Sequence, residues 1–229
     1  MTFYDLWEEN VKNKYDDISF ICSFLNRTDG SMEVINYGTN DEIYRMSMFL
    51  YNYDLEKIIE RLPSNYIEIA PANIMQFSSF TVGINEVPRV LCIRKTELSF
   101  EEVGYELLGS KNDLALKKYG ENHSKLAEVF SLVTLSTNRP TKVKITNFGE
   151  FSVPMDLNYK FKVLKMLAIR DGLIRNIINS AKKGIVYFSE ETSCISESTR
   201  IRRKPNVKYV LEFILKGTKY EGLLNNIIW

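Results

Sequence analysis

The segment 99–153 constrains the fold most, because it carries successive signals for helix starts, a helix stop and paired strands. Ser99 precedes Glu102 by three residues, which is the spacing of a capping box at the start of a helix. Asn112, like the aspartate after it, is suited to begin a second helix. Gly120 is suited to end that helix, since glycine adopts a positive φ without strain. We therefore predict two short helices with a tight turn after the second, followed by a third helix.

The third predicted helix runs from about 122 to 131 and is amphipathic. Its polar side is free to meet a groove and carries Asn122, His123, Ser124 and Lys125. Beyond it, apolar and polar residues alternate as in strands on both sides of the turn sequence 138–141. This pattern predicts a β-hairpin with Arg139 near its tip. Lys142 and Lys144 share one face of the second strand, where they suit either phosphate contact or solvent exposure.

The run 126–151 resembles the winged helix-turn-helix pattern, in which a helix leads through a strand into a hairpin that ends in Leu-Thr-x-Leu-Gly. In this chain the closing motif reads Ile-Thr-Asn-Phe-Gly at 145–149. The resemblance implies a third helix that reads a groove of DNA and a hairpin that contacts the backbone, as in parts of some restriction endonucleases and in regulators. Because winged helices also dock proteins, the resemblance leaves both kinds of partner open.

A second module of this kind is predicted near the C-terminus. A helical pattern at 159–181 leads through Gly184 to a run that begins at Ser196 and is similar to the Ser-x-Ser-Thr-x-x-Arg-Arg helix of many helix-turn-helix proteins. The resemblance implies a recognition helix near 198–214, capped by Ser196 or Ser198. Its candidate DNA contacts are Ser198, Thr199, Arg200, Arg202, Arg203, Lys204 and Lys208.

Pro205 interrupts this second pattern. Proline suits the first turn of a helix and is poorly tolerated in the interior. The recognition helix can therefore begin at Lys204 or Pro205 instead, with the arginines in the turn before it.

The part of the chain before residue 98 gives weaker signals. Apolar spacing predicts a short helix near 3–11, a helix or a strand at 18–25, and a longer helix at 43–62 that Pro63 ends. Its tyrosines are spaced for packing, so we predict core positions for them rather than a recognition surface. These tyrosines are Tyr37, Tyr44, Tyr51, Tyr53 and Tyr66.

Together these patterns predict a mainly α fold with small β wings. Residues 1–97 are expected to form an acidic, aromatic-rich α/β part, 98–155 a winged-helix module, and 156–229 a second helix-turn-helix or winged-helix-like module. The chain of 229 residues, 45% of them hydrophobic, is long enough and apolar enough for packed cores.

The formal net charge of +1 hides an uneven distribution of charge. Between residues 1 and 70, thirteen acidic residues face six basic ones, whereas basic residues predominate between 158 and 209. Such an asymmetry indicates that the basic part faces a polyanion.

Cysteine and histidine usage argues against several classes of site. The three cysteines, Cys22, Cys92 and Cys194, lack metal-ligand spacing, and His123 is the only histidine. We therefore expect no zinc finger, no disulfide scaffold and no cofactor. The N-terminus carries acids where a secretory signal carries bases, and no apolar run reaches about 18 residues, so we expect a cytoplasmic protein without membrane contact.

Catalytic motifs are not supported by the spacing of the charged residues. No lysine follows an acidic residue by two positions, the spacing with which a common restriction-type nuclease core holds Mg²⁺ and steadies the attacking water. The segment 104–111 has the glycine spacing of a phosphate-binding loop. That motif ends in Gly-Lys-Ser or Gly-Lys-Thr, whereas this segment ends in Gly-Ser-Lys, so we do not interpret it as such a loop. A minority hypothesis, Mg²⁺-dependent nuclease activity, uses scattered carboxylates such as Asp16, Asp17, Glu33 and Asp41.

The first functional hypothesis is sequence-specific binding of double-stranded DNA without catalysis, in a restriction or phage-defence system or in a transcriptional regulator. The alternative is an adaptor whose winged-helix modules dock proteins, with the N-terminal part as a further interface. Winged-helix proteins often act as dimers, so we expect a homodimer or a larger defence complex. The apolar tail 223–229 suits either a dimer contact or a helix that closes the core.

Overall fold

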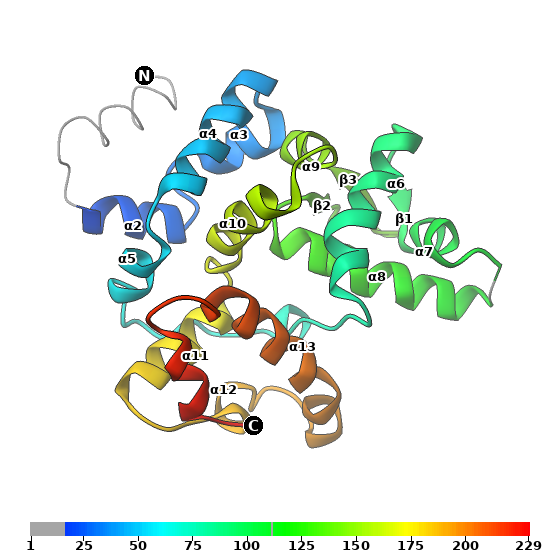
Figure 1. Cartoon of the computed structure of the whole chain (residues 1–229). Helices are drawn as coiled ribbons and strands as arrows, with labels where there is room; N and C mark the ends of the chain where they lie inside the picture. Colours follow the sequence, from blue (N-terminus) through cyan, green and yellow to red (C-terminus); the bar gives the residue numbers. More distant parts are fainter. Residues whose placement is uncertain (1–16, 111) are drawn as a thin grey trace.

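The computed structural model describes residues 17–110 and 112–229, and over these residues it is mainly helical with two small sheets (Figure 1). The mainly α fold class is therefore confirmed. The short helix predicted near 3–11 lies outside the described residues.

The described residues before position 98 form helices and no strand. The α/β character predicted for this part is therefore wrong for its described residues, and the run 18–25 belongs to a helix. The elements are α2 (Asp17–Leu25), α3 (Ser31–Tyr37), α4 (Asn40–Asn52), α5 (Leu55–Glu60), the 3-10 helix η1 (Pro71–Asn73), the π-helix η2 (Val82–Glu86) and α6 (Val87–Arg94).

The single long helix predicted at 43–62 is two helices in the structure. Helix α4 starts at a capping box formed by Thr39 and Glu42 and ends before Tyr53. Asp54 then caps α5, because its side chain accepts a hydrogen bond from the amide of Glu56 at 2.9 Å. A carboxylate that satisfies the free amides of a first turn favours a new helix over continuation of the old one.

The five tyrosines of the N-terminal part divide into two groups. Tyr51 stacks on Tyr159 with ring centroids 4.7 Å apart, and Tyr53 packs against Phe20 at 5.2 Å. The prediction of core packing is confirmed for these two. It is wrong for the three tyrosines that are exposed, which are Tyr37, Tyr44 and Tyr66.

The segment 98–152 folds as a strand, two helices, a hairpin and a short helix. Its elements are β1 (Leu98–Ser99), α7 (Phe100–Leu108), α8 (Asp113–Val129), β2 (Val133–Leu135), β3 (Lys142–Ile145) and α9 (Asn147–Ser152). The three strands form an antiparallel sheet in the order β1-β3-β2, in which Leu98 pairs with Val143 and Val133 pairs with Ile145. The predicted hairpin is therefore confirmed, with Arg139 exposed in the loop between β2 and β3.

Both helix starts predicted in this segment are confirmed. The hydroxyl of Ser99 accepts from the amide of Glu102 at 3.2 Å, and the Glu102 carboxylate accepts from the amide of Ser99 at 2.6 Å. Asn112 caps α8 by accepting a hydrogen bond from the amide of Ala115 at 2.8 Å. These local contacts involve residues two to four positions apart, which is why the sequence pattern predicts them.

The helix stop predicted at Gly120 is wrong, because α8 continues from Asp113 to Val129. A Cβ at Gly120 would lie 1.8 Å from the carbonyl oxygen of Phe100, and a Cβ at Gly104 would lie 2.0 Å from that of Leu116. Both glycines are therefore needed for close contact between the backbones of α7 and α8. The predicted second and third helices are one helix, which crosses α7 at these two positions.

The C-terminal part contains four α-helices and a small parallel sheet among its residues. The elements are α10 (Leu157–Ala168), α11 (Gly172–Lys183), β4 (Val186–Tyr187), α12 (Phe188–Glu191), α13 (Glu197–Leu215), the 3-10 helix η3 (Glu221–Asn226) and β5 (Ile227–Ile228). The helical pattern at 159–181 is divided after Arg170, because Asp171 accepts a hydrogen bond from the amide of Ile174 at 3.1 Å and so begins α11.

Pro205 lies inside α13, so the start predicted at Lys204 or Pro205 is wrong. The helix begins after Ser196, which occupies the N-cap position as predicted, although its side chain makes no capping hydrogen bond. Proline deprives the carbonyl of Ile201 of its helical partner. Ile201 lies on the exposed side of α13, where water can satisfy that carbonyl.

The tail after α13 forms η3 and β5, and β5 pairs in parallel with β4. No antiparallel hairpin follows α13 in the part of the chain that the structure describes, so a second wing is not present there. Trp229 packs on Phe188 with ring centroids 5.3 Å apart, and Ile227 is buried. The tail therefore covers the local core, although not as an α-helix.

Buried apolar side chains form one continuous cluster to which every α-helix from α2 to α13 contributes. Helix α10 lies in the middle of the molecule, against α4 on one side and α13 on another (Figure 1). None of the described helices combines the length and the hydropathy that crossing a bilayer requires.

Candidate nucleic-acid interface

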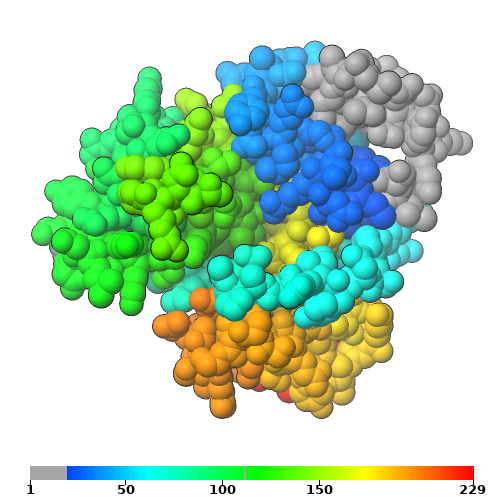
Figure 2. All heavy atoms as spheres, turned by 180° about the vertical axis from the view of Figure 1, so that it is seen from behind, coloured from blue at the N-terminus to red at the C-terminus, as the bar shows by residue number. Residues whose placement is uncertain are grey.

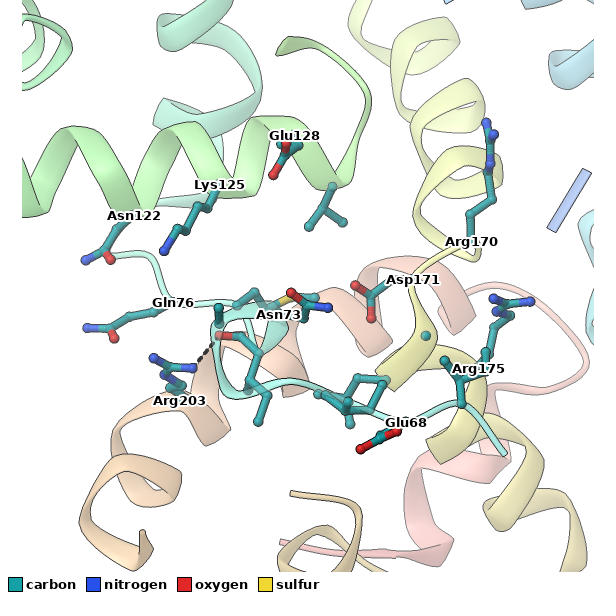
Figure 3. A pocket seen from close by; sticks show the side chains of 18 of the residues that line it. Glu68, Asn73, Gln76, Asn122, Lys125, Glu128, Arg170, Asp171, Arg175 and Arg203 are labelled. Atoms are coloured by element: carbon teal, nitrogen blue, oxygen red, sulfur yellow. Dashed lines mark hydrogen bonds between the residues drawn. The ribbon is translucent and has the colours of Figure 1, made fainter. Parts of the chain in front are cut away.

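A cleft of about 860 Å³ opens between α8, the loop 67–76, the first half of α13 and the junction of α10 with α11. Figure 2 shows the face of the molecule on which segments from the N-terminal, central and C-terminal parts meet around this hollow. Figure 3 shows the side chains that line it. Because its walls come from distant parts of the sequence, the cleft exists only in the folded chain.

Helix α8 supplies one wall of the cleft. Lys118, Asn122 and Lys125 follow one another at intervals of three or four residues, so they lie on one side of the helix and line the cleft together. The ammonium of Lys125 lies 2.5 Å from the carboxylate of Glu121. Burial raises the pKa of the Glu128 carboxyl, which lies one turn further along the same side. This wall therefore mixes cations with two carboxylates.

Helix α13 supplies the facing cations, Arg202 and Arg203. The guanidinium of Arg203 donates to the carbonyls of Pro71 and Ile74, the second at 2.9 Å, and so fastens η1 to α13. Burial lowers the pKa of Arg203. Arg202 is exposed, which makes it the more accessible cation of the pair.

Amide side chains lie between these cations. Asn73 ends η1 and Gln76 lies in the loop after it, and Asn122 projects from α8 toward the same end of the cleft as Arg203 (Figure 3). An amide offers both donors and an acceptor, the combination with which proteins read base edges. The cleft thus places hydrogen-bonding amides beside positive charges.

Four residues predicted as DNA contacts meet in this cleft, although they come from two segments about 80 positions apart in the sequence. They are Asn122, Lys125, Arg202 and Arg203.

Two residues predicted on the same polar face, His123 and Ser124, are fully buried, and the prediction is wrong for them. His123 Nδ1 lies 2.8 Å from the carbonyl of Tyr119, and Nε2 accepts a hydrogen bond from the amide of Ser79 at 3.3 Å. Burial lowers the pKa of His123, which keeps the imidazole neutral. The histidine therefore fastens the loop before η2 to α8 rather than facing a ligand.

The hairpin residues lie outside the cleft. Arg139 and Lys144 are exposed, as a contact with a phosphate backbone requires. Lys142 is half-buried and lies 3.3 Å from the carboxylate of Glu102, so its charge is already paired.

The remaining predicted contacts on α13 are divided between surface and interior. The guanidinium of Arg200 donates to the hydroxyl of Thr192 and to the carbonyl of Ile195, both at 3.2 Å, so it joins α12 to α13 and does not serve as a free cation. Lys208 is exposed and lies 3.9 Å from Glu212. The other three are exposed or half-buried outside the cleft: Ser198, Thr199 and Lys204.

The sequence patterns miss three arginines at the other end of the cleft, Arg27, Arg170 and Arg175. Arg27 follows α2, whereas the other two flank the start of α11. No motif links segments so far apart. One local feature of the sequence does point to this region. Asp171 is an N-cap residue type in the middle of the helical pattern predicted at 159–181, and it indicates that a new helix starts there.

The described residues contain no cluster of three metal-ligating side chains. Of the carboxylates in the nuclease hypothesis, Glu33 and Asp41 are exposed on different helices. Asp16 lies outside the described residues. Lys111, the lysine of the segment 104–111 that is similar to a phosphate-binding loop, also lies outside them.

Comparison with known proteins adds no residue assignment to the cleft. No family model matches this chain, no curated protein matches it, and no solved structure matches it.

Proposed function

We propose that this protein binds duplex DNA without catalysis, through a winged-helix module that includes α8 and through the cleft that α8 shares with α13. The order of elements supports the module: helix α6, strand β1, helices α7 and α8, then the hairpin β2–β3. Strand β1 pairs with β3, so the hairpin and β1 form one antiparallel sheet beside these helices. In this arrangement α8 takes the position of the recognition helix and the hairpin takes that of the wing.

The observation that carries the proposal is the convergence of cations from two helices on one cleft. The exposed cations are Lys118 on α8 and Arg202 on α13, whereas Lys125 is paired with Glu121 and Arg203 is held by the carbonyls of Pro71 and Ile74. Lysine and arginine side chains that neutralise phosphates release counterions, which supplies most of the affinity for DNA. The amides of Asn73, Gln76 and Asn122 lie beside these cations and suit base edges. In this proposal the three amide side chains provide the preference for a DNA sequence, and the cations provide most of the affinity for DNA.

The hairpin extends this surface. Arg139 at its loop and Lys144 on β3 are exposed cations that suit the phosphate backbone on one side of the groove. Such a module serves as the recognition part of a restriction or phage-defence system or as a transcriptional regulator.

The test is the affinity for a fluorescent duplex, measured by anisotropy across a series of salt concentrations. If the four exposed cations Lys118, Arg139, Lys144 and Arg202 each neutralise one phosphate, affinity should fall about a hundredfold between about 50 and about 200 mM salt. An affinity that is flat across this range contradicts the proposal.

A second candidate function, a protein-docking adaptor, is favoured by the exposed aromatic rings of the N-terminal part. Tyr37, Tyr44 and Tyr66 are 77%, 53% and 65% exposed. Tyrosine is enriched at protein interfaces because its ring is apolar and its hydroxyl can remain hydrated. The variant Arg202→Glu separates the two functions, since it removes DNA binding in the first and leaves a tyrosine-based interface intact in the second.

A further inference from the structure

The end of the cleft remote from Arg203 gathers three arginines. Arg27 comes from the loop between α2 and α3, and Arg170 and Arg175 flank the start of α11. Figure 3 shows the guanidinium groups of Arg170 and Arg175 on the same side of the α10–α11 junction. Three like charges in one place need an explanation, because their mutual repulsion opposes folding.

Arg170 is the most unusual of the three. Its side chain is only 3% exposed, and none of its three guanidinium nitrogens has a hydrogen-bond partner among the described residues. The group lies over the ring of Phe24, with the central carbon 5.0 Å from the ring centroid. Burial lowers the pKa of Arg170 to about 10. A buried guanidinium whose donors have no acceptor destabilises a protein, so these donors remain available for a ligand that accepts hydrogen bonds.

The neighbouring carboxylates offset only part of this charge: Asp29 acts to raise the pKa of Arg170, and Asp171 acts to raise that of Arg175. Within the described residues, none of the three arginines forms an ion pair. Asp171 accepts from the amide of Ile174 as the cap of α11, and Asp29 accepts from the hydroxyl of Ser31 at 2.6 Å. Three guanidinium groups therefore face two carboxylates, and the nitrogens of Arg170 still have no hydrogen-bond acceptor among the described residues.

Arg175 and Arg27 complete the arrangement. Arg175 donates to the side chain of Asn26 at 3.4 Å, and its Nε is buried without a partner in the described part of the chain. Arg27 is exposed, so an incoming anion meets it first, with half-buried Arg175 and buried Arg170 behind it.

We propose that Arg27, Arg170 and Arg175 form a binding site for a phosphate group at this end of the cleft. Guanidinium groups bind phosphate through paired hydrogen bonds and remain charged at any physiological pH, which makes arginine the preferred residue for such a site. The phosphate belongs either to a free nucleotide or to the 5′-phosphorylated end of a DNA strand. This inference goes beyond the proposed function, because it does not depend on the winged-helix module.

The experiment is thermal unfolding of the full chain with inorganic phosphate, against sodium chloride at the same ionic strength. At about tenfold excess over the dissociation constant, phosphate should raise the melting temperature by about 3–6 °C. The variant Arg170→Met should melt higher than the wild type without phosphate, because it removes a buried guanidinium whose donors have no acceptor, and should not respond to phosphate. Equal shifts with both salts, or an unchanged phosphate response in Arg170→Met, would overturn the proposal.

A second variant tests the site without changing the buried residue Arg170, whose substitution could impair folding. Arg27 is exposed, so Arg27→Gln should fold normally and weaken phosphate binding at least tenfold, whereas Lys183→Gln on the exposed end of α11 should not change it. Equal phosphate affinity in Arg27→Gln and the wild type contradicts the site.

Two further ligands identify the source of the phosphate. Adenosine monophosphate should shift the melting temperature if the site takes nucleotides, and a 5′-phosphorylated duplex should shift it more than a 5′-hydroxyl duplex if the site takes a strand end. A response to neither contradicts the assignment to phosphate esters. If duplex DNA fails to bind while the response to phosphate persists, only the proposed DNA function fails.

Discussion

Gly104 and Gly120 face each other where α7 crosses α8, and neither position has room for a side chain. A Cβ on Gly120 would lie 2.8 Å from the backbone nitrogen of Gly104 and 1.8 Å from the carbonyl oxygen of Phe100. Two helix backbones in direct contact fix the orientation of α8 relative to the rest of the module. The presentation of Lys118, Asn122 and Lys125 to the cleft therefore depends on this crossing.

Gly120→Ala is expected to destabilise the protein by at least about 2 kcal/mol, because the methyl group forces α7 and α8 apart. Helix propensity alone gives the opposite sign, a gain of about 1 kcal/mol for alanine inside a helix. Urea unfolding measures the difference. Gly222→Ala is the matched control, since a Cβ at Gly222 meets nothing within 4 Å and should change stability little. A Gly120→Ala variant as stable as the wild type is incompatible with the close crossing.

Lys160→Met is expected to stabilise the protein at neutral pH. Lys160 is 2% exposed, its ammonium donates to the side chain of Asn85 at 2.9 Å, and burial lowers its pKa from 10.5 to about 8. A shift of this size corresponds to about 3 kcal/mol at most, of which the lost hydrogen bond to Asn85 offsets part. The free energy of unfolding at pH 7 should therefore rise by about 1–2 kcal/mol in the variant.

The pH dependence gives Lys160 a second test. Because its folded-state pKa is lowered, the wild type should gain stability as the pH rises from about 8 to about 10.5, and Lys160→Met should lack this gain. Lys117→Met, at an exposed position of α8, serves as the control and should follow the wild type. Parallel stability curves for the wild type and Lys160→Met would show that the ammonium is not buried.

His123 is expected to make stability fall as the pH drops below about 6.5. Burial lowers its pKa in the folded state, so the unfolded chain binds the proton first, and stability declines by at most about 1.4 kcal/mol per pH unit. His123→Gln should remove this contribution. The quantity to measure is the difference in free energy of unfolding between wild type and variant from pH 8 to pH 5. A difference that stays constant across this range argues against a buried neutral imidazole.

Arg203 and Arg202 are expected to differ sharply in their effect on stability although they are adjacent. Arg203→Ala removes two hydrogen bonds to the carbonyls of Pro71 and Ile74, so the free energy of unfolding should fall by about 1–3 kcal/mol. Arg202→Ala changes an exposed side chain and should stay within about 0.5 kcal/mol of the wild type. Equal losses in the two variants contradict the anchoring role of Arg203. Substitutions at Arg203 therefore cannot test DNA binding cleanly.

The sequence predicts the two helix starts and the hairpin of segment 98–152 because the contacts that define them are local. The Ser99–Glu102 capping box and the Asn112 cap join residues three positions apart, and the β2–β3 hairpin pairs residues eight to twelve positions apart. Such contacts leave a readable signature in the spacing of residue types.

The same local signals mislead where a distant contact decides the conformation. Gly120 has the residue type of a helix stop, but its role is to accommodate the backbone of α7. Pro205 has the residue type of a helix start, but packing of α13 on the core carries the helix through it. The intrinsic helix propensity of a single residue affects the conformation less than the burial of a long apolar helix face does.

The cleft itself could be predicted only in part. The sequence identifies Asn122, Lys125 and Arg202 as polar residues with suitable chemistry, but not that they face one another. The buried state of His123 was not predicted either, because its hydrogen-bond acceptor and donor come partly from the distant loop at Ser79. Long-range contacts of this kind have no fixed sequence spacing.

The central claim, that α8 and α13 bind one DNA duplex together, is tested most directly by the salt dependence of binding in three variants. The slope of log affinity against log salt concentration should be about 0.9 shallower than in the wild type for Lys118→Gln on α8 and for Arg202→Gln on α13. Lys183→Gln, an exposed position outside the cleft, should leave the slope unchanged. If both cleft variants keep the wild-type slope, or if Lys183→Gln lowers it equally, the shared cleft is not where DNA binds.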